Sequence, residues 1–483
     1  MSIQKGWRSC DKCSGLFYAP VGNTCPRGGA HDASESTGLL PFVAAQSNSQ
    51  DRWRWCRRCG AMFYAGLGAG VCPAGGGHDA SGSGQYWIQT SRPAGLAQGG
   101  WRWCKNCQVL HRPWPRTTST CPAANGGPHS VEGSGEYGLR VQLVGQGIAV
   151  AYQGRGNDGT IWLSLRHDYE WLGHLRVPGG CSVTPSPVMF GNKLYIFYQG
   201  MGDCRELWFT SFDGLEFSAS KQVPNIRLKG APSAFVCDGR LEVWVQGTSR
   251  DCHLWRNWAT DIDKNQWQSE LVTPNTPIWN DPGALPMPAN GGGALVFYEQ
   301  AMDTTGGKGS TGYLYFVDTR SGVHEKVTWK PARGTPAPVL FQGRVYVFRE
   351  SSEGDGAPIY WSFLPGDNWK NTLAERTPYF RVSGVVAPVI DTHGLWVFFE
   401  GAGDSGELYC VETTNGTNWN APIKLEGVGG VDRVRRDALQ LQRVSREGPA
   451  LLPRQRSKPL RMRRCSRHDG DLRRLPDAAA RMA

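Results

Sequence analysis

Short apolar runs recur along the chain from about residue 147 to residue 427, and each run is about five residues long. Examples are Leu194 to Tyr198, Val345 to Phe348 and Leu395 to Phe399. The runs do not alternate apolar with polar positions, which is typical of a strand buried on both faces. Segments with an X-Pro step precede several runs, and Gly/Asp loops and hairpin turns follow them. Each unit therefore predicts four short strands.

One short phrase marks the repeat: it begins with Ala151-Tyr152-Gln153-Gly154 and continues through Phe197-Tyr198-Gln199-Gly200 to Phe398-Phe399-Glu400-Gly401. Six copies follow one another at intervals of 46 to 53 residues, which is within the range of propeller blades. The sequence predicts an all-β chain whose residues 140–430 form a β-propeller of about six four-stranded blades, with seven as the alternative.

Two columns of side chains recur at equivalent places in these repeats. The first column always holds an amide or a carboxylate: Gln153, Gln199, Gln246, Glu299, Glu350 and Glu400. The second column is always aromatic: Trp162, Trp208, Trp255, Tyr315, Tyr360 and Tyr409. Planar polar groups suit sugar hydroxyls and aromatic rings suit sugar C–H faces, so both columns are candidate ligand-binding residues. The alternative is structural: the first column caps the backbone of a neighbouring blade, and the second fills the core.

Three Cys/His modules precede the repeats, and they are predicted to cover residues 1–45, 46–95 and 96–139. Each module has a Cys-x2-Cys pair, a distant third Cys and a His: Cys10, Cys13, Cys25 and His31; Cys56, Cys59, Cys72 and His78; Cys104, Cys107, Cys121 and His129. Three cysteines cannot all pair within one module. Four such ligands suit a closed tetrahedral site, so we predict up to three structural Zn²⁺ ions. Disulfides between modules and free thiols are the alternatives. His111 is predicted to be a surface residue and not a ligand.

Charge changes the picture only at the end of the chain. The net charge is +10, but residues 432–483 hold fifteen Lys/Arg and six Asp/Glu, which leaves about +1 for the rest. Attraction to phosphate is therefore not favoured for the ordered part, and nucleic acid is an unlikely partner. Residues 431–483 are predicted to be a basic tail of low order. The alternative is a shifted reading frame near residues 427–434.

No apolar run is long enough to span a membrane, and the first residues do not have the pattern of a signal peptide. We therefore expect a cytoplasmic protein, or one released without a signal peptide.

The segment from Phe190 to Gly200, with Leu207-Trp208 and Ser211 to Gly214 behind it, resembles the blade repeat of bacterial β-propeller lectins, including fucose-binding ones. The resemblance covers roughly residues 147–427, and the modules in front resemble tandem zinc-ribbon-like repeats. It implies a lectin-like protein with several weak glycan sites between blades. A scaffold that binds a protein partner is the alternative function. A propeller glycoside hydrolase is disfavoured, because catalysis needs two carboxyls in unlike environments and the repeat offers equivalent ones.

Overall fold

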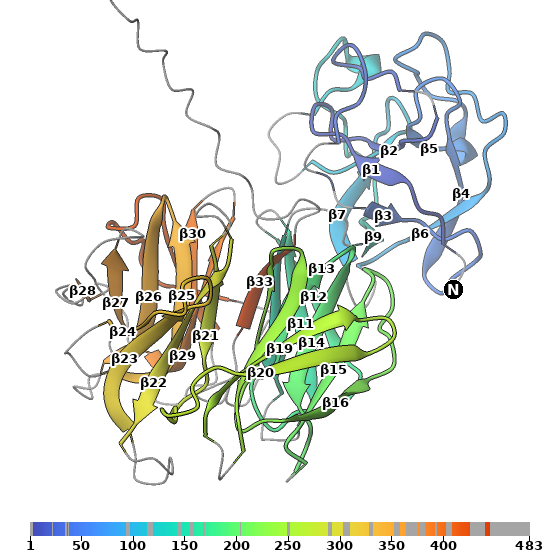
Figure 1. Cartoon of the computed structure of the whole chain (residues 1–483). Helices are drawn as coiled ribbons and strands as arrows, with labels where there is room; N and C mark the ends of the chain where they lie inside the picture. The colour runs from blue at the N-terminus through green and yellow to red at the C-terminus, as the bar shows by residue number, and fades with distance from the viewer. Residues whose placement is uncertain are drawn as a thin grey trace, which may run out of the picture. The chain divides into compact units, whose positions relative to one another are not determined.

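A computed structural model shows an all-β chain (Figure 1). It divides into two compact units, residues 1–448 and 449–483. The structure describes residues 3–21, 23–33, 36, 38–92, 97–113, 119–142, 147–154, 159–167, 170–202, 204–248, 252–287, 292–302, 310–327, 332–351, 358–363, 375–376, 382–391, 394–401, 408–425 and 440–444. Within these ranges no helix has the length and apolarity needed to cross a bilayer.

Six antiparallel four-stranded sheets form the blades of a propeller, as the repeat predicts. Blade 1 contains β10 (Gly147–Gln153), β11 (Ile161–His167), β12 (Glu170–Val177) and β33 (Gln440–Val444). Blade 2 contains β13 (Ser186–Phe190), β14 (Lys193–Gln199), β15 (Glu206–Phe212) and β16 (Lys221–Arg227). Blade 3 contains β17 (Ser233–Cys237), β18 (Arg240–Gln246), β19 (Leu254–Asp261) and β20 (Gln266–Leu271).

Blade 4 contains β21 (Gly283–Pro286), β22 (Ala294–Ala301), β23 (Ser310–Asp318) and β24 (His324–Lys326). Blade 5 contains β25 (Ala332–Phe341), β26 (Arg344–Ser351), β27 (Pro358–Phe363) and β28 (Glu375–Arg376). Blade 6 contains β29 (Val382–Ile390), β30 (Leu395–Gly401), β31 (Leu408–Thr413) and β32 (Ile423–Lys424).

The innermost strands close a ring around the axis. In cyclic order β13, β17, β21, β25, β29 and β33 each contact the next, and β33 contacts β13. An innermost strand is the edge of its own sheet, so the N–H groups on the side away from the second strand have no partner strand in that sheet. This explains why Pro187, Pro338 and Pro388 lie within such strands. The second strand of a blade is buried on both faces, as the burial of β14 and β18 shows.

Blade 1 receives its innermost strand from the far end of the chain. Strand β33 pairs with β10 over five residues, from Gly147 opposite Val444 to Ala151 opposite Gln440. Figure 1 shows β33 as the last coloured strand, near β13 of blade 2. It lies inside the segment that the sequence analysis predicts to be a low-order tail. The propeller is closed by hydrogen bonds between the two ends of residues 147–444.

The three modules have one common plan. In each, a hairpin carries the Cys-x2-Cys turn, and a third strand pairs with the first strand of the hairpin. The strands are β1 (Trp7–Ser9), β2 (Leu16–Tyr18) and β3 (Gly38–Leu40); β4 (Ser49–Trp55), β5 (Met62–Tyr64) and β6 (Tyr86–Gln89); β7 (Ala97–Trp103), β8 (Leu110–His111) and β9 (Tyr137–Gln142). Two short 3-10 turns, η1 (Ala65–Leu67) and η2 (Pro122–Ala124), complete them.

The repeated Trp residues Trp7, Trp53 and Trp101 lie on the first strand of each hairpin and are fully buried. They belong to one buried apolar cluster that contains residues of all three modules and of blades 1 and 2, so a module does not depend on its own few apolar residues for a core.

Candidate functional sites

Each module brings its predicted Cys3His set together. In every set the four ligand atoms lie within 4.8 Å of one another, and the cysteines are buried. No disulfide joins any described cysteine, so the disulfide alternative is not supported in this part of the chain. The local cause is the same each time: the hairpin presents the Cys-x2-Cys turn, and the third Cys and the His come from the following loop.

The ligand spacings match a tetrahedral metal site. A metal–sulfur distance of about 2.3 Å requires sulfur atoms about 3.8 Å apart in a tetrahedron. The first and third cysteines of the modules are separated by 3.9, 3.8 and 3.8 Å between Sγ atoms. The second cysteine lies 3.6, 3.5 and 3.3 Å from Nδ1 of the histidine. All four positions are filled by protein, so the residues fit a closed, structural site.

In module 2 the thiols and the imidazole strongly shift one another's pKa values. The hydrogen bond from Cys59 lowers the pKa of Cys56 to about 3, while hydrogen bonds to Cys56 and Cys72, together with burial, raise the pKa of Cys59. Burial pulls the pKa of His78 down, but hydrogen bonds to Cys56 and Cys72 raise it to about 9. Thiols that ionise easily are suited to hold a cation, because the thiolate is the ligand form of cysteine.

The prediction that His111 lies on the surface is wrong. Its side chain has no exposed area, and its ring stacks on that of His129 with centroids 4.3 Å apart. Phe17 and Phe63 stack on His31 and His78 in the same way. Burial and the nearby His129 lower the pKa of His111 to about 3. His111 is not part of a ligand set, as predicted, and it occupies a position that is aromatic in all three modules.

The first column of the propeller lies between blades. The four described members are buried and lie at or near the end of the second strand of their blades: Gln153, Gln199, Gln246 and Glu299. Gln153 Nε2 donates to the carbonyl of Cys181 at 3.1 Å, and Gln199 Oε1 accepts from the N–H of Gly230 at 3.0 Å.

Gln246 Nε2 donates to the carbonyl of Ile278. In each of these three cases the partner belongs to the segment that leads into the next blade. This geometry agrees with the structural alternative for the column. The side chains of Glu350 and Glu400 lie outside the described residues.

Blade 4 departs from this pattern with a buried ion pair. Glu299 Oε2 accepts from Nη2 of Arg349 in blade 5, and from Nδ2 of Asn280 at 2.6 Å. Arg349 is 1% exposed and also donates to the carbonyl of Gly334 at 3.1 Å. Burial raises the pKa of Glu299 against the opposing effect of Arg349, and burial lowers the pKa of Arg349. The contact between two blades is therefore ionic here.

The second column is placed differently, with half-buried rings. Trp162, Trp208, Trp255, Tyr315 and Tyr409 all lie on the third strand of a blade and are neither buried nor fully exposed. The side chain of Tyr360 lies outside the described residues. Tyr315 stacks on Tyr298 of the adjacent strand at 5.9 Å, and Tyr409 stacks on Phe399 at 6.0 Å. One side of such a ring rests on the blade.

Polar side chains flank the second column on the outer strand. The residues directly opposite the aromatic positions include Arg176, Gln222, Lys326 and Lys424, paired with Trp162, Trp208, Tyr315 and Tyr409. Opposite residues in neighbouring strands lie on the same face of a sheet. Each of these four aromatic rings therefore has a hydrogen-bond donor beside it. Trp255 differs, because the residue opposite it on the outer strand is the apolar Leu271.

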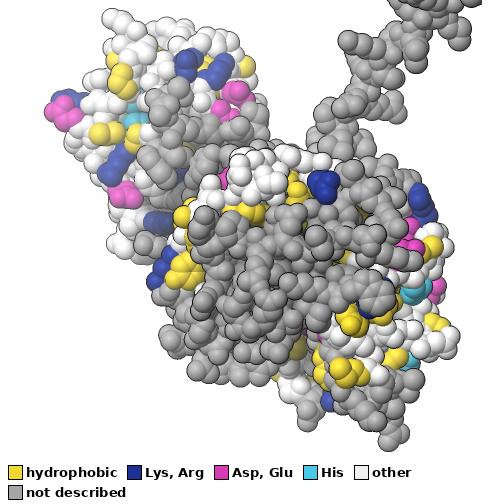
Figure 2. All heavy atoms as spheres, turned by 90° about the vertical axis from the view of Figure 1, so that its left-hand side faces the viewer, with side chains coloured by type: hydrophobic (Ala, Val, Ile, Leu, Met, Phe, Trp, Pro, Cys, Tyr) yellow, Lys and Arg dark blue, Asp and Glu magenta, His cyan; other side chains and the backbone are white. Residues whose placement is uncertain are grey.

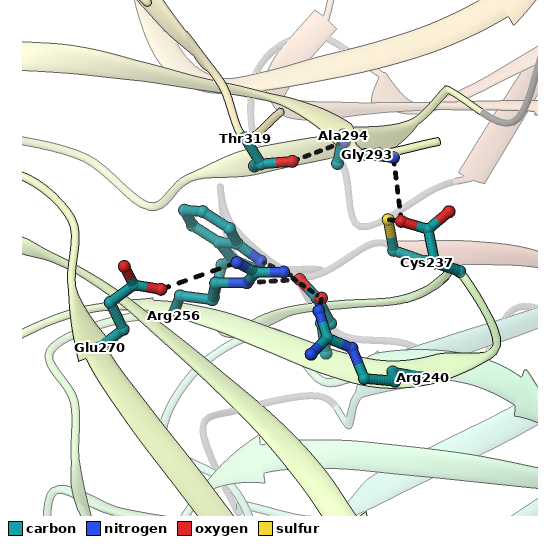
Figure 3. A network of polar contacts seen from close by, with 10 residues as sticks. Cys237, Arg240, Arg256, Glu270, Gly293, Ala294 and Thr319 are labelled. Carbon is teal, nitrogen blue, oxygen red and sulfur yellow. Dashed lines mark hydrogen bonds and ion pairs between the residues drawn. The ribbon is translucent and has the colours of Figure 1, made fainter. Parts of the chain in front are cut away.

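A polar network in blade 3 was not anticipated from the sequence (Figure 3). Glu242 is fully buried and accepts from Arg256 Nη2 at 2.6 Å, Arg240 Nη2 at 3.2 Å and Trp244 Nε1 at 3.1 Å. Arg256 also reaches Glu270 at 3.6 Å. Two arginines and two carboxylates balance, so the network is a neutral structural cluster within blade 3.

No protein-family model matches the chain, and no curated protein matches it. Solved structures are similar in fold. One is AofleA from Arthrobotrys oligospora, with 12% identity over 59% of this chain and 87% of that one and a TM-score of 0.42. Another is SapL1 lectin in complex with alpha methyl fucoside, with 12% identity over 57% and 94% and a TM-score of 0.40. A third is an alpha-L-arabinofuranosidase from Clostridium thermocellum, with 10% identity over 50% and 94% and a TM-score of 0.35. At these identities and scores the likeness does not identify the function of this chain.

The three Cys3His sets are expected to bind one metal ion each. Elemental analysis of the purified full chain is expected to give about three metal ions per chain, one for each Cys3His set. Cys56→Ser should lower the content by about one ion, because a set that loses a thiolate binds metal far more weakly. Cys252→Ser, at a buried cysteine of the propeller, is the matched control and should leave the content unchanged. A metal-free chain that remains folded would contradict the assignment.

Proposed function

We propose that this protein binds carbohydrate through the half-exposed aromatic rings of the second column. The observation that carries the proposal is their repeated setting: each ring rests on the blade, leaves part of its surface to solvent, and in four blades has an Arg, Lys or Gln directly opposite it. A ring covers the C–H face of a sugar, and a neighbouring donor reaches its hydroxyl groups.

The proposal assigns the two columns different roles. The buried Gln and Glu side chains use their polar atoms on the protein itself, so the first column contributes to the joints between blades. The second column keeps its rings near solvent. Several similar platforms on one ring of blades would bind a branched glycan by multivalency, although each platform binds weakly. Fucose-type glycans are the first ligands to test, on the resemblance stated above.

Binding is favoured over hydrolysis by the residues around the propeller axis. The described innermost strands carry no Asp or Glu, and small side chains join neighbouring blades there: Ser186 Oγ accepts from Ala234 N at 2.9 Å, and Ser233 Oγ from Ala284 N at 3.2 Å. A glycosidase needs two carboxyls across one bond. The aromatic platforms are repeated equivalents, which suits reversible binding.

A protein-binding scaffold remains the second candidate. Among the described side chains on the face drawn in Figure 2, Lys/Arg and Asp/Glu are interspersed, so these side chains do not favour a strongly charged partner. We further propose that the Cys3His sets hold Zn²⁺, because three thiolates and one imidazole in a closed tetrahedron suit this ion.

The test of sugar binding uses 5-fluorotryptophan-labelled full chain and ¹⁹F NMR. Methyl α-L-fucoside, and the methyl glycosides of galactose, mannose and N-acetylglucosamine, are titrated to about 10 mM, which covers millimolar affinities. At least one sugar is expected to shift the resonances of Trp162, Trp208 and Trp255. No shift with any sugar, together with capture of a protein ligand, would favour the scaffold. Release of free sugar from a chromogenic glycoside would favour the enzyme.

Trp208→Leu and Trp208→Phe form the matched variants for this test. Leu removes the flat face and should weaken that site about 2- to 12-fold, which corresponds to the value of one aromatic contact. Phe keeps a flat aromatic face, although a smaller one, and gives up an indole Nε1–H that has no hydrogen-bond partner among the described residues, so Trp208→Phe should weaken binding less than Trp208→Leu does. Equal weakening by both substitutions would count against a stacking platform.

A further inference from the structure

The three Cys/His modules form a closed ring in which each module contacts the next at the turn that carries its Cys-x2-Cys pair. One backbone hydrogen bond recurs at every junction: Tyr18 N to Gly60 O at 2.9 Å, Tyr64 N to Gln108 O at 2.9 Å, and Arg112 N to Ser14 O at 3.0 Å. Isolated bridges accompany them, between Phe17 and Ala61, Phe63 and Val109, and Gly15 and His111. The modules are therefore joined close to their ligand sets.

Two of the three junctions have a further hydrogen bond, which is made by the histidine of a Cys3His set. The Nδ1 atom of His31 faces its own cysteines, and its Nε2 lies 3.1 Å from the carbonyl oxygen of Cys59. His78 has the same relation to Cys107, also at 3.1 Å. Cys59 and Cys107 are ligands of the next module. A histidine ligand in module 1 or 2 is thus oriented by the backbone of a ligand in the following module.

The junction from module 3 back to module 1 lacks this bond. His129 Nε2 is buried and has no hydrogen-bond partner among the described residues, and neither ring nitrogen of His111 has one. A second difference agrees with the first. Tyr86 packs edge-on against Trp7 of module 1 at 5.2 Å, and Tyr137 packs against Trp53 of module 2 at 5.3 Å. In module 1 the residue at the position of Tyr86 and Tyr137 is Leu39, so module 1 has no such aromatic side chain there.

We propose that the modules release metal in order, with module 3 first, module 2 second and module 1 last. His129 is the ligand whose second nitrogen is not fixed, and a partner on that nitrogen typically changes metal affinity 10- to 100-fold. When module 3 loses its metal, the turn with Cys107 loosens and His78 loses its carbonyl partner. Loss of metal from module 2 then loosens the turn with Cys59, and His31 of module 1 loses its carbonyl partner. This order is independent of the proposed carbohydrate binding.

The first experiment uses the unchanged full chain loaded with Zn²⁺. A limiting amount of chelator is added, free thiols are trapped with N-ethylmaleimide at intervals, and the modified cysteines are identified by peptide mass spectrometry. The cysteines of module 3 (Cys104, Cys107 and Cys121) are expected to react first, at least about 10-fold faster than those of module 1 (Cys10, Cys13 and Cys25). Equal rates in the three modules, or module 1 first, would overturn the proposal.

A matched pair of variants tests the direction of the effect. Cys121→Ser and Cys25→Ser remove the third cysteine of module 3 and of module 1. Cys121→Ser is expected to speed release from module 2 about 10-fold, because it loosens the partner of His78. Cys25→Ser should leave release from modules 2 and 3 unchanged. An unchanged thermal transition of the propeller verifies folding of both variants, and equal effects of the two on module 2 would refute a directional order.

Discussion

Deleting residues 432–483 is expected to open the propeller and to destabilise it by about 5 kcal/mol. The deletion removes β33, which pairs with β10 over five residues, and each lost backbone hydrogen bond costs about 1 kcal/mol. It also separates β29 from β13 at the ring closure and leaves a free edge on β10. Differential scanning calorimetry should show a lower propeller transition, and light scattering should show association through the open edge.

Deletion of residues 449–483 is the control for this prediction. It keeps β33 and removes only the second compact unit, so the propeller transition should stay at the temperature of the full chain. If both truncated chains melt at the same temperature as the full chain, β33 does not close the ring. The two truncations together distinguish the contribution of β33 from that of the residues that follow it.

Glu299→Gln is expected to destabilise the propeller by about 3–5 kcal/mol. The substitution is nearly isosteric, but it leaves the guanidinium of Arg349, which is 1% exposed, without a carboxylate. Removing one partner of a buried ion pair is costly because the other charge stays desolvated. Urea unfolding followed by tryptophan fluorescence measures the loss in the propeller transition.

The repeat itself supplies the compensating substitution. In blades 1 and 2 the residue before the first-column Gln is Tyr152 or Tyr198, whereas blade 5 has Arg349 in that place. The double variant Glu299→Gln, Arg349→Tyr should therefore recover most of the stability, because buried ion pairs can often be replaced by uncharged groups. A double variant no more stable than Glu299→Gln would show that the loss does not come from the unpaired guanidinium.

The sequence predicts the blades and the ligand sets well because both are local patterns. A blade is built from consecutive strands, so its apolar runs, X-Pro steps and turns lie within about fifty residues. A Cys3His set needs only one hairpin and one loop, so its spacing is visible in the chain. The closing strand is not local. Its partner β10 lies almost 300 residues earlier in the sequence, and no pattern in residues 440–444 predicts that pairing.

The first column shows what the repeat leaves open. A Gln at the end of a buried strand can face solvent or the next blade, and the neighbouring blade decides which. Gln199 is buried and accepts a hydrogen bond from Gly230, in the segment that leads into the next blade. The same holds for His111, because its ring is covered by His129 of its own module and its strand contacts Gly15 of module 1, and neither residue is near it in the sequence.

Glu242 departs from the repeat in a way that is visible in the sequence. The equivalent positions, four residues before the first-column residue, are Tyr195, Leu295 and Tyr346 in blades 2, 4 and 5. A carboxylate at such a buried position requires charged partners nearby, and Arg240 and Arg256 supply them. A lone acidic residue in an apolar column of a repeat therefore predicts basic side chains on its own strand and on the adjacent one, as Arg240 and Arg256 are here.

The joints between blades have a fixed direction. Gln199 extends its side chain forward to Gly230, and its own carbonyl accepts from Ser182 N, in the segment that Gln153 contacts from behind. Gln246 repeats both contacts one step further on, forward to Ile278 and back to Lys229. Each unit thus presents one half of a coupling at its front and the complementary half at its rear. Joints of this type match one another, so a further blade with the same Gln could be inserted between two of them without a new kind of contact, whereas the Glu299–Arg349 joint would not accept it.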